Sequence, residues 1–234
     1  MSFFWTQQSI RWHLDASTYT GFYKKVAKRI VPYLKPSDTL CDAGCGLGSL
    51  DLELAPYVLN LTAIDIDPRV IDQLRQEAAL KGLENLHAMC GDATLLKRHF
   101  DIVLMSFFGK SEDGLKAYYQ LCRRKLIRIV NAENRGNLYP NHHRQTTKDT
   151  IPIVQKDLVD QGFEFELIID SIEFGQPLRS WHDGEDFIFH HAPAASAKEV
   201  NDFLHENIIS TNQEDFPFYL PNMKRIGIFI IDIS

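Results

Sequence analysis

The sequence contains no apolar run of about 20 residues, the length that a helix needs to cross a bilayer, so we expect no membrane-spanning segment. The opening residues, MSFFWTQQSIRWHLD, lack a basic start followed by a long apolar stretch, which argues against secretion and favours a cytoplasmic location. Cysteine is scarce as well: there are four, with no CxxC pair and no Cys/His spacing typical of zinc sites. We therefore expect reduced, buried thiols and no structural metal.

Excess positive charge is also missing. Lys and Arg number 25 against 31 Asp and Glu, a formal net charge of −6, which argues against broad electrostatic binding to nucleic acid. The two short basic clusters, KKVAKR at 24–29 and RRKLIR at 123–128, are typical of a solvated helix face and of a helix end leading into a strand. With 234 residues, a hydrophobic share of 44% and no internal repeat, the chain is expected to form one globular domain.

Short apolar segments alternate with amphipathic ones along the chain. Strands are predicted at 39–44, 61–66, 85–92, 100–108, 126–133, 163–174 and 225–234. Helices are predicted at 17–34, 50–55, 67–83, 112–125 and 147–162, the last of them interrupted near Pro152. This alternation requires crossover connections and predicts an α/β fold with a seven-stranded, mostly parallel sheet between two helical layers. Because no ordinary crossover helix directly follows the sixth strand, the last strand is expected to run antiparallel.

Residues 176–222 separate the last two strands and are rich in aromatic residues, histidine and proline. One or two helices are expected there, the better one at 195–208, while FIFHH at 187–191 also fits a strand with a polar end. The acidic and histidine side chains of this segment do not match the spacing of any known ligand set, so no metal site is predicted; they are His182, Asp183, Glu185, His190 and His191.

The stretch TLCDAGCGLGSLDLELA, residues 39–55, carries glycines at 44, 46 and 48 between a predicted strand and a predicted helix. The dinucleotide fingerprint G-x-G-x-x-G would require glycine at position 49, which is Ser49. The spacing here is G-x-G-x-G preceded by Asp42, which suits a smaller zwitterionic group. Asp65 ends the next strand and can accept hydrogen bonds from both hydroxyls of a ribose, because ligands of open α/β sheets bind at the carboxyl ends of strands.

The ordered set of motifs resembles the class I methyltransferases that depend on S-adenosylmethionine. LCDAGCGLG resembles the first motif of that family, LTAIDIDP its ribose-binding strand, MCGDA its adenine-binding turn and FDIVLMS its fourth strand. The resemblance covers about residues 37–133 by motif and the later strands by pattern. It implies a single Rossmann-like, three-layer domain with lid segments: a helical lid at 1–36, a cofactor-binding core at 37–175, a substrate cap at 176–222 and the last strand at 223–234.

The resemblance also implies roles for individual residues towards S-adenosylmethionine. The methionine portion would be wrapped by the turn at Gly44, Cys45, Gly46 and Gly48, with Asp42 beneath it. Asp65 would hold the ribose and Ile66 would lie against the adenine face. The adenine edge would meet Asp92 and Ala93, and Ser106 would stand beside the sulfonium.

The sequence predicts the substrate less precisely than it predicts the cofactor. Enzymes that methylate the amines of nucleic-acid bases resemble one another in an Asp/Asn-Pro-Pro-aromatic tetrapeptide after the fourth strand, where this chain has MSFFG. A small molecule methylated at oxygen, nitrogen or carbon is therefore favoured over a nucleic acid or a protein. No catalytic residue is predicted beyond His142 and His143, which are candidates for a general base or simply polar surface residues.

Two alternatives of other classes stay open. One is a non-catalytic protein that binds S-adenosylmethionine as a sensor or scaffold, since methyl transfer needs positioning more than a recognisable catalytic residue. The other is a nicotinamide oxidoreductase, which Ser49 disfavours.

Overall fold

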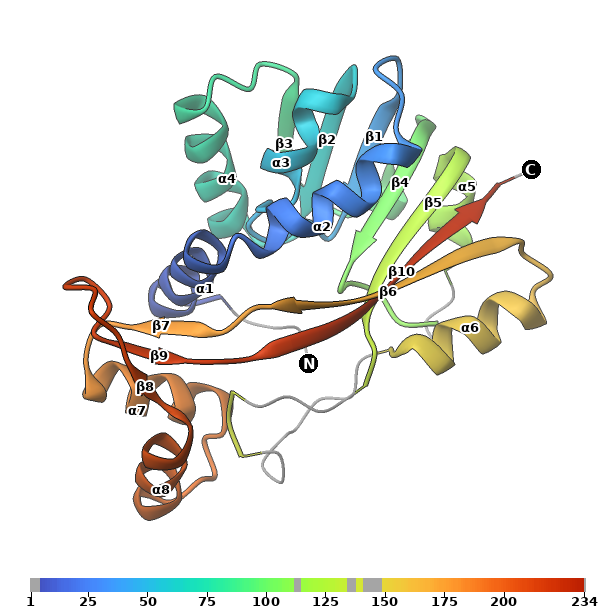
Figure 1. The fold of residues 1–234 in the computed structure, drawn as a ribbon. Coiled ribbons are helices and arrows are strands. Elements are labelled where there is room, and N and C mark those ends of the chain that lie inside the picture. The colour runs from blue at the N-terminus through green and yellow to red at the C-terminus, as the bar shows by residue number, and fades with distance from the viewer. Residues whose placement is uncertain (1–4, 112–114, 134–137, 141–148, 234) are drawn as a thin grey trace.

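The structure is a computed structural model that describes residues 5–111, 115–133, 138–140 and 149–233. Its centre is a seven-stranded sheet in the order β3-β2-β1-β4-β5-β10-β6 (Figure 1). The strands are β1 Thr39–Ala43, β2 Asn60–Asp65, β3 Leu86–Cys90, β4 Phe100–Ser106, β5 Cys122–Asn131, β6 Phe165–Glu173 and β10 Met223–Asp232. All neighbouring pairs from β3 to β5 are parallel, whereas β10 lies antiparallel between β5 and β6. The predicted α/β sheet with an antiparallel last strand is confirmed.

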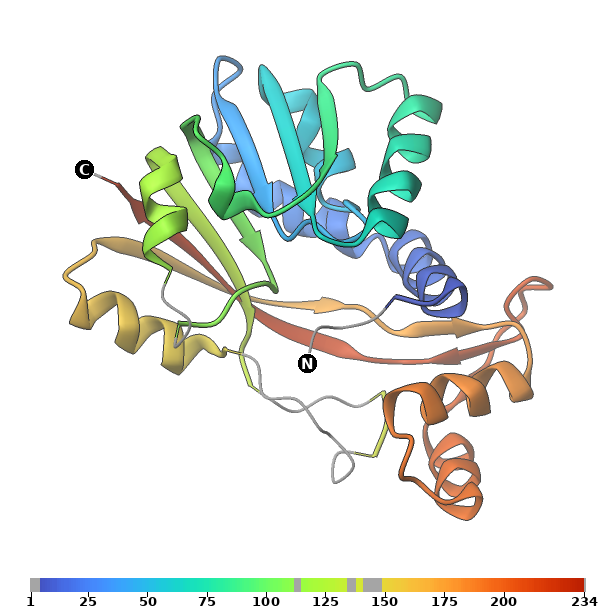
Figure 2. The same cartoon turned by 180° about the vertical axis from the view of Figure 1, so that it is seen from behind.

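Helices cover both faces of this sheet (Figures 1 and 2). One face is covered by α2 Phe22–Ile30, α3 Asp51–Leu54 and α4 Pro68–Leu80, and the other by α5 Lys116–Leu121 and α6 Ile151–Asp160. Successive strand residues point to opposite faces, so Leu104 packs under α2 and α4 while Val103 packs under α5 and α6. The central strands β1, β2 and β4 are buried on both faces, and they are therefore nearly continuous apolar runs in the sequence.

The amino-terminal region forms two helices where the sequence predicted one over 17–34. Helix α1, Gln7–Thr20, begins with a capping box in which Ser9 N donates to Thr6 Oγ1 (3.1 Å) and Thr6 N to Ser9 Oγ (2.9 Å). It ends at Gly21, whose φ of 61° lies in the left-handed region. The chain turns there and continues as α2, so the single-helix expectation was wrong because a glycine stops the first helix.

Two other boundaries differ from expectation for tertiary reasons. The segment 112–125 was predicted as helix, but within the described part α5 ends at Leu121 and β5 already begins at Cys122, which pairs with Phe100. The gain from sheet pairing outweighs the helix propensity of this basic stretch. Pro152 does not interrupt a helix; it lies in the first turn of α6, where its missing N–H costs no hydrogen bond.

Residues 176–222 build a unit at the far end of β6 and β10, which we call the cap. It contains α7 Trp181–His191, α8 Ala197–Asn207 and a three-stranded antiparallel sheet, β7 Gln176–Leu178, β8 Ile209–Ser210 and β9 Phe218–Leu220, in the order β7-β9-β8. Figure 1 shows β6 running on into β7 and β9 into β10, with α1 and α7 beside β7. The small sheet was not predicted, and the predicted helix at 195–208 is confirmed as α8.

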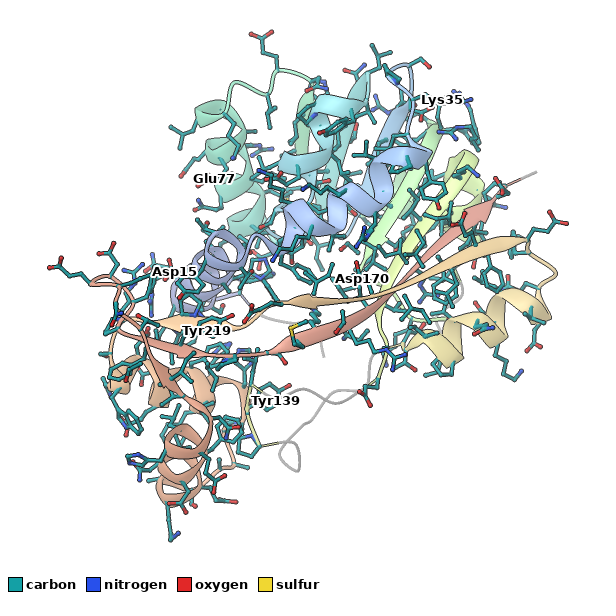
Figure 3. The ribbon with its side chains drawn as sticks, viewed as in Figure 1. Asp15, Lys35, Glu77, Tyr139, Asp170 and Tyr219 are labelled. Atoms are coloured by element: carbon teal, nitrogen blue, oxygen red, sulfur yellow. The ribbon has the colours of Figure 1, made fainter. Side chains whose placement is uncertain are left out.

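The strand expectation for FIFHH was wrong, because these residues form the last turns of α7. Phe187 and Ile188 are buried in a core that the cap shares with Trp12 of α1, and this packing selects the helix. Figure 3 shows Asp15 of α1 near this junction, where its carboxylate accepts from Arg179 Nη2 (3.0 Å). No helix in the described residues is long and apolar enough to cross a membrane.

Candidate functional site

The glycine turn lies at the carboxyl end of β1 and is fastened to the end of β2. Gly44 N and Cys45 N both donate to the carbonyl of Ile64, at 2.8 and 3.0 Å, and Gly48 N closes the turn by donating to Cys45 O at 3.0 Å. Two positions require glycine for space as well as for their positive φ. A Cβ on Gly44 would lie 2.2 Å from the ring of Phe108, and one on Gly48 would lie 2.4 Å from Leu74.

Asp65 ties the turn to the neighbouring strands. Its Oδ2 accepts from Gly46 N (2.9 Å) and its Oδ1 from Asp67 N (3.0 Å). Its backbone carbonyl accepts from Gly91 N (2.9 Å) at the end of β3. The end of β2 therefore holds the glycine turn on one side and the turn after β3 on the other, and these three predicted binding segments are brought together.

Two buried carboxyl groups lie beneath the turn. Asp42 of β1 is 1% exposed and Asp51 of α3 is 0% exposed. In the described structure no N–H or O–H donor reaches Asp42 Oδ1 or either side-chain oxygen of Asp51, and the two carboxyl groups lie within hydrogen-bonding range of each other. Burial raises the pKa of both groups, that of Asp51 to about 8, so the pair holds a proton at neutral pH.

Asp51 is a site residue that the sequence analysis missed. Its signal was an acidic residue at an inward position of the helix after the turn, in GSLDLELA. The two carboxyl groups also affect neighbouring residues. The pKa of the Cys45 thiol and that of the Tyr23 hydroxyl are raised mainly by burial, and further by the negative charges of Asp42 and Asp51. Cys45 is consequently a protonated thiol in the turn.

The loops after β2 and β3 present the other predicted residues. Ile66 is a large apolar residue, yet it is 68% exposed. Asp92 Oδ1 accepts from Thr94 N (2.8 Å) and Thr94 Oγ1 (2.7 Å), which lowers the pKa of Asp92, and no partner is found for its Oδ2 among the described residues. Ala93 is buried next to it. An exposed apolar side chain and an ionised carboxylate thus occur on adjacent loops.

Ser106 is the last residue of β4, which pairs with β1 in parallel. It therefore lies at the same edge of the sheet as the glycine turn that follows β1. The loop that follows folds over the glycine turn. Phe107 has a φ of 54° and donates its N–H to Ile129 O (2.9 Å), while Phe108 lies against Gly44. Lys224 Nζ lies 3.8 Å from the centre of the Phe107 ring. The SFF stretch is therefore part of the site's wall.

The histidine candidates are dispersed. His142 and His143 lie outside the described residues. In the cap, His182 is exposed and lies 3.2 Å from Glu185, whereas Asp183 is held by Arg11 and Trp12 of α1. His191 stacks on Tyr139 with ring centres 5.4 Å apart. Across the described ranges no three His, Cys, Asp or Glu side chains are grouped to hold a metal ion.

Cavities of the described residues lie beside the sheet at different places, and we compare two of them. The larger, about 290 Å³, lies at the amino-terminal ends of the strands, between residues such as Thr39, His87 and Arg123. Ligands of open α/β sheets bind at the opposite edge, so we do not assign it to the glycine turn. The smaller, about 140 Å³, lies between α1, the β6–β7 junction and α7 and has Trp5 in its wall.

Known proteins share this core. Residues 40–127 match the family model described as a methyltransferase domain. The structure of magnesium protoporphyrin IX methyltransferase from Synechocystis PCC 6803 with bound SAH superposes with a TM-score of 0.54 and 17% identity, covering 90% of this chain and 84% of that one. Residues 40–127 thus match a methyltransferase domain, and the superposition shows that the fold is shared. The methyltransferase resemblance predicted from the glycine turn and the motifs after it is confirmed over these residues.

Sequence relatives match over this methyltransferase core. The chain is 37% identical over 83 residues to the ribosomal RNA small subunit methyltransferase A of Moorella thermoacetica, which is 36% of this chain and 27% of that protein. It is 31% identical over 102 residues to a probable cobalt-precorrin-6B C(15)-methyltransferase (decarboxylating) of Methanosarcina mazei, 42% of this chain and 55% of that protein. The chain thus spans less than two thirds of either relative.

Proposed function

We propose that this chain binds S-adenosylmethionine at the glycine turn and transfers its methyl group to a small molecule. The observation that carries the proposal is the set of acidic groups at the turn: the carboxyl groups of Asp42 and Asp51, which share a proton, lie buried beneath it, and Asp65 accepts from its Gly46 N–H. S-adenosylmethionine brings a sulfonium and an ammonium, both cationic. The pyrophosphate of a nicotinamide dinucleotide is anionic, and acidic groups at this position oppose it.

The residues present fit this cofactor. The buried Asp42–Asp51 pair lacks enough donors of its own, and a cation above the turn stabilises its negative charge. In this proposal Asp65 accepts from the ribose hydroxyls and Ile66, which is 68% exposed, packs on the adenine ring. Asp92 accepts from the adenine amino group beside Ala93, and Ser106 stands on the open side.

When bound, the cofactor supplies a methyl group already activated on sulfur. The chain then has to orient the acceptor, exclude water and hold the cofactor's charged end in place. Phe107 and Phe108 exclude water from the glycine turn, and the Phe108 ring already packs on Gly44. The glycine turn and Asp65 would hold the cofactor, and hydrogen bonds at the ends of β1 and β2 fix both in place. No general base is assigned.

A small-molecule acceptor is supported by the net charge of −6 and by the apolar SFF loop. The Methanosarcina mazei relative is named for a corrin precursor, a small molecule, and the structural neighbour for magnesium protoporphyrin IX. The Moorella thermoacetica relative is named for ribosomal RNA, so RNA is the competing acceptor. Methylation of RNA by the purified protein, with none of any small molecule, would replace our proposal.

Calorimetric titration with S-adenosylmethionine, S-adenosylhomocysteine (SAH) and NAD tests the cofactor assignment. We expect micromolar binding of the first two and none of NAD. Release of labelled methyl onto an acceptor then separates an enzyme from a protein that only binds the cofactor. Preference for NAD would contradict the cofactor assignment, and tight binding without turnover on any acceptor class would favour a sensor or scaffold.

A further inference from the structure

We propose that the cavity between α1, the β6–β7 junction and α7 binds the methyl acceptor, and that this acceptor is an aromatic ring carrying a hydroxyl group, held by His13. This inference rests on the proposed function, whose substrate class it names. Residues of α1, the β6–β7 junction and α7 line the cavity, and Figures 1 and 2 show α1 and α7 beside β7.

The size of the cavity suits one ring. It measures about 140 Å³. An engineered apolar cavity of about 150 Å³ in another protein binds benzene, whereas drug-sized ligands need about 300 Å³ or more. A single six-membered ring with one or two small substituents therefore fills this space, and a tetrapyrrole or a nucleotide does not.

The walls of the cavity are flat and apolar. They include Trp5, Trp12, Phe174 and Phe187, and Trp12 meets Phe187 edge to face with centres 5.3 Å apart. Aromatic side chains pair best with another ring in offset or edge-to-face contact, worth about 0.5–1.5 kcal/mol per pair beyond area burial. These walls select an aromatic ligand over an aliphatic one of the same size.

Two imidazoles are polar groups that the cavity leaves to a ligand. No hydrogen bond from the side chain of His13 or His191 occurs within the described residues, whereas Gln176 Nε2 already donates to Trp12 O (3.2 Å) and Pro177 O (3.0 Å). Burial, helped by nearby Lys224, lowers the pKa of His13 to about 3, and burial, helped by His190, lowers that of His191 to about 4.

Both imidazoles are thus neutral at physiological pH. A neutral imidazole offers one acceptor and one donor nitrogen, which match a hydroxyl group. It offers no positive charge for a carboxylate or a phosphate, and burying such an anion beside it would be costly. The polar groups of the cavity therefore point to a phenolic hydroxyl on the ring.

The cavity adjoins the glycine turn through shared side chains. Trp5 lines the cavity, lies 5.5 Å from His13 between ring centres, and would lie 3.6 Å from a Cβ on Gly46. His13 is also 5.5 Å from Tyr23, whose pKa responds to Asp42 and Asp51 beneath the turn. Trp5 thus borders both the cavity and the glycine turn, so the cavity lies next to the predicted methionine subsite, as the position of an acceptor requires.

Transfer of the methyl group to a phenolic hydroxyl needs no further reactant. The hydroxyl oxygen forms a bond to the methyl carbon, the carbon–sulfur bond breaks with its electron pair on sulfur, and the hydroxyl proton passes to water. The products are an aryl methyl ether and SAH. With its lowered pKa, His13 orients the hydroxyl and does not store the proton.

The experiment measures binding of phenol, cyclohexanol and benzoate by saturation-transfer NMR, with and without SAH, to the full chain and to its variants. We expect phenol to bind, and cyclohexanol and benzoate to bind at least tenfold more weakly. His13→Phe keeps the ring shape but removes the nitrogens, and should weaken phenol binding about tenfold or more. Ala16→Leu, which fills the cavity from α1, should abolish it. His205→Phe, on α8 outside the cavity, is the matched control.

SAH affinity, measured by calorimetry on the same variants, should stay within about twofold and shows that each variant folds. With S-adenosylmethionine and phenol, mass spectrometry should detect methyl phenyl ether from the unchanged protein. Equal phenol binding by both cavity variants, or equal binding of cyclohexanol, would overturn the cavity assignment. Phenol binding without ether formation would overturn the acceptor role. Failure to bind SAH would instead contradict the proposed function, while phenol binding still reports on the cavity.

Discussion

Asp65 combines two tasks in one carboxylate. Its oxygens already accept from Gly46 N and Asp67 N, and in our proposal they also face the ribose. A carboxylate oxygen can accept more than one hydrogen bond, so the structural contacts leave capacity for a ligand. The sequence predicted that this residue ends a strand. It did not predict the hydrogen bond to the glycine turn, which depends on the fold.

Asp65→Ala should therefore weaken S-adenosylmethionine binding by roughly 2–3 kcal/mol, or about 30- to 150-fold, through loss of charge-assisted hydrogen bonds. It should also lower the free energy of unfolding by about 1–2 kcal/mol, because Gly46 N loses its partner. Asp67→Ala is the control: this residue caps α4 and should cost about 1 kcal/mol of stability without changing affinity. Calorimetry and urea unfolding measure both quantities. Unchanged affinity in Asp65→Ala would show that the ribose lies elsewhere.

Asp51 gives the protein a pH-dependent stability. Because its pKa rises from 3.8 to about 8 on folding, the folded protein binds more protons than the unfolded chain between these values. The stability that this group contributes is complete below about pH 4 and is lost as the pH rises towards 8. Asp51→Asn removes the ionisable group and keeps its shape. At about pH 8 the variant should exceed the unchanged protein in free energy of unfolding by about 1 kcal/mol or more, the equivalent of one pKa unit.

The difference should shrink as the pH approaches 4, and urea unfolding across this range measures it. Glu53→Gln, half-exposed on the same helix, is the control and should show no such trend. If Asp51→Asn is less stable than the unchanged protein at about pH 8, the two buried carboxyl groups do not share a proton.

Strand β5 is joined to two loops by a buried ion pair. Arg128 is fully buried and donates to Asp149 Oδ2 (2.5 Å), Ser111 Oγ (3.0 Å) and Gly109 O (3.3 Å). Ser111 N also donates to Asp149 Oδ2 (2.7 Å). In the sequence Arg128 closes the basic cluster RRKLIR, which was interpreted as a helix end leading into a strand. The structure instead places it under the loop that follows β4, where it supports the wall formed by Phe107 and Phe108.

Asp149→Ala should lower the free energy of unfolding by about 3–5 kcal/mol, because it leaves a buried guanidinium without its counter-charge. The double variant Arg128→Met with Asp149→Leu removes both charges and should recover most of that loss. Denaturant unfolding of the three proteins tests this. A double variant as unstable as the single one would show that shape, and not charge, governs this junction.

The cap and the core meet through α1. Asp183 of α7 accepts from Trp12 Nε1 (2.9 Å), from Arg179 N (3.0 Å) and from Arg11. Burial alone would raise its pKa, but the hydrogen bonds from Arg11, Arg179 and Trp12 outweigh burial and lower the pKa of Asp183. On the core side, Asp170 of β6 accepts from Arg29 of α2 (2.7 Å). Figure 3 shows Asp170 on β6 and Tyr219 on the neighbouring ribbon, β9.

Asp183→Ala should lower the free energy of unfolding by about 2–3 kcal/mol and speed hydrogen exchange in α7, since the hydrogen bonds from Arg11 and Trp12 of α1 to α7 are lost. Because the pKa of Asp183 is lowered on folding, its stabilising effect is present above about pH 4 and is lost as the pH falls below it. The difference between the variant and the unchanged protein should therefore fade in acid. Asp202→Ala, on α8 of the cap, is the control, because Asp202 accepts from Lys198 of its own helix and not from α1. Equal rates of hydrogen exchange in α7 of the unchanged protein and both variants would show that apolar packing alone holds the cap against α1.

The sequence by itself determined the architecture of the core, since strand and helix periodicities and the glycine turn depend on residues close together in the chain. It also determined the family, because Asp42, Gly44 and Asp65 follow one another in a recognisable order. The tertiary structure decided what distant residues do to one another. It paired Asp51 with Asp42, buried Arg128, folded FIFHH as helix and brought His13 and His191 to the wall of one cavity. Such outcomes depend on burial and charge summed over the packed chain, which no local pattern contains.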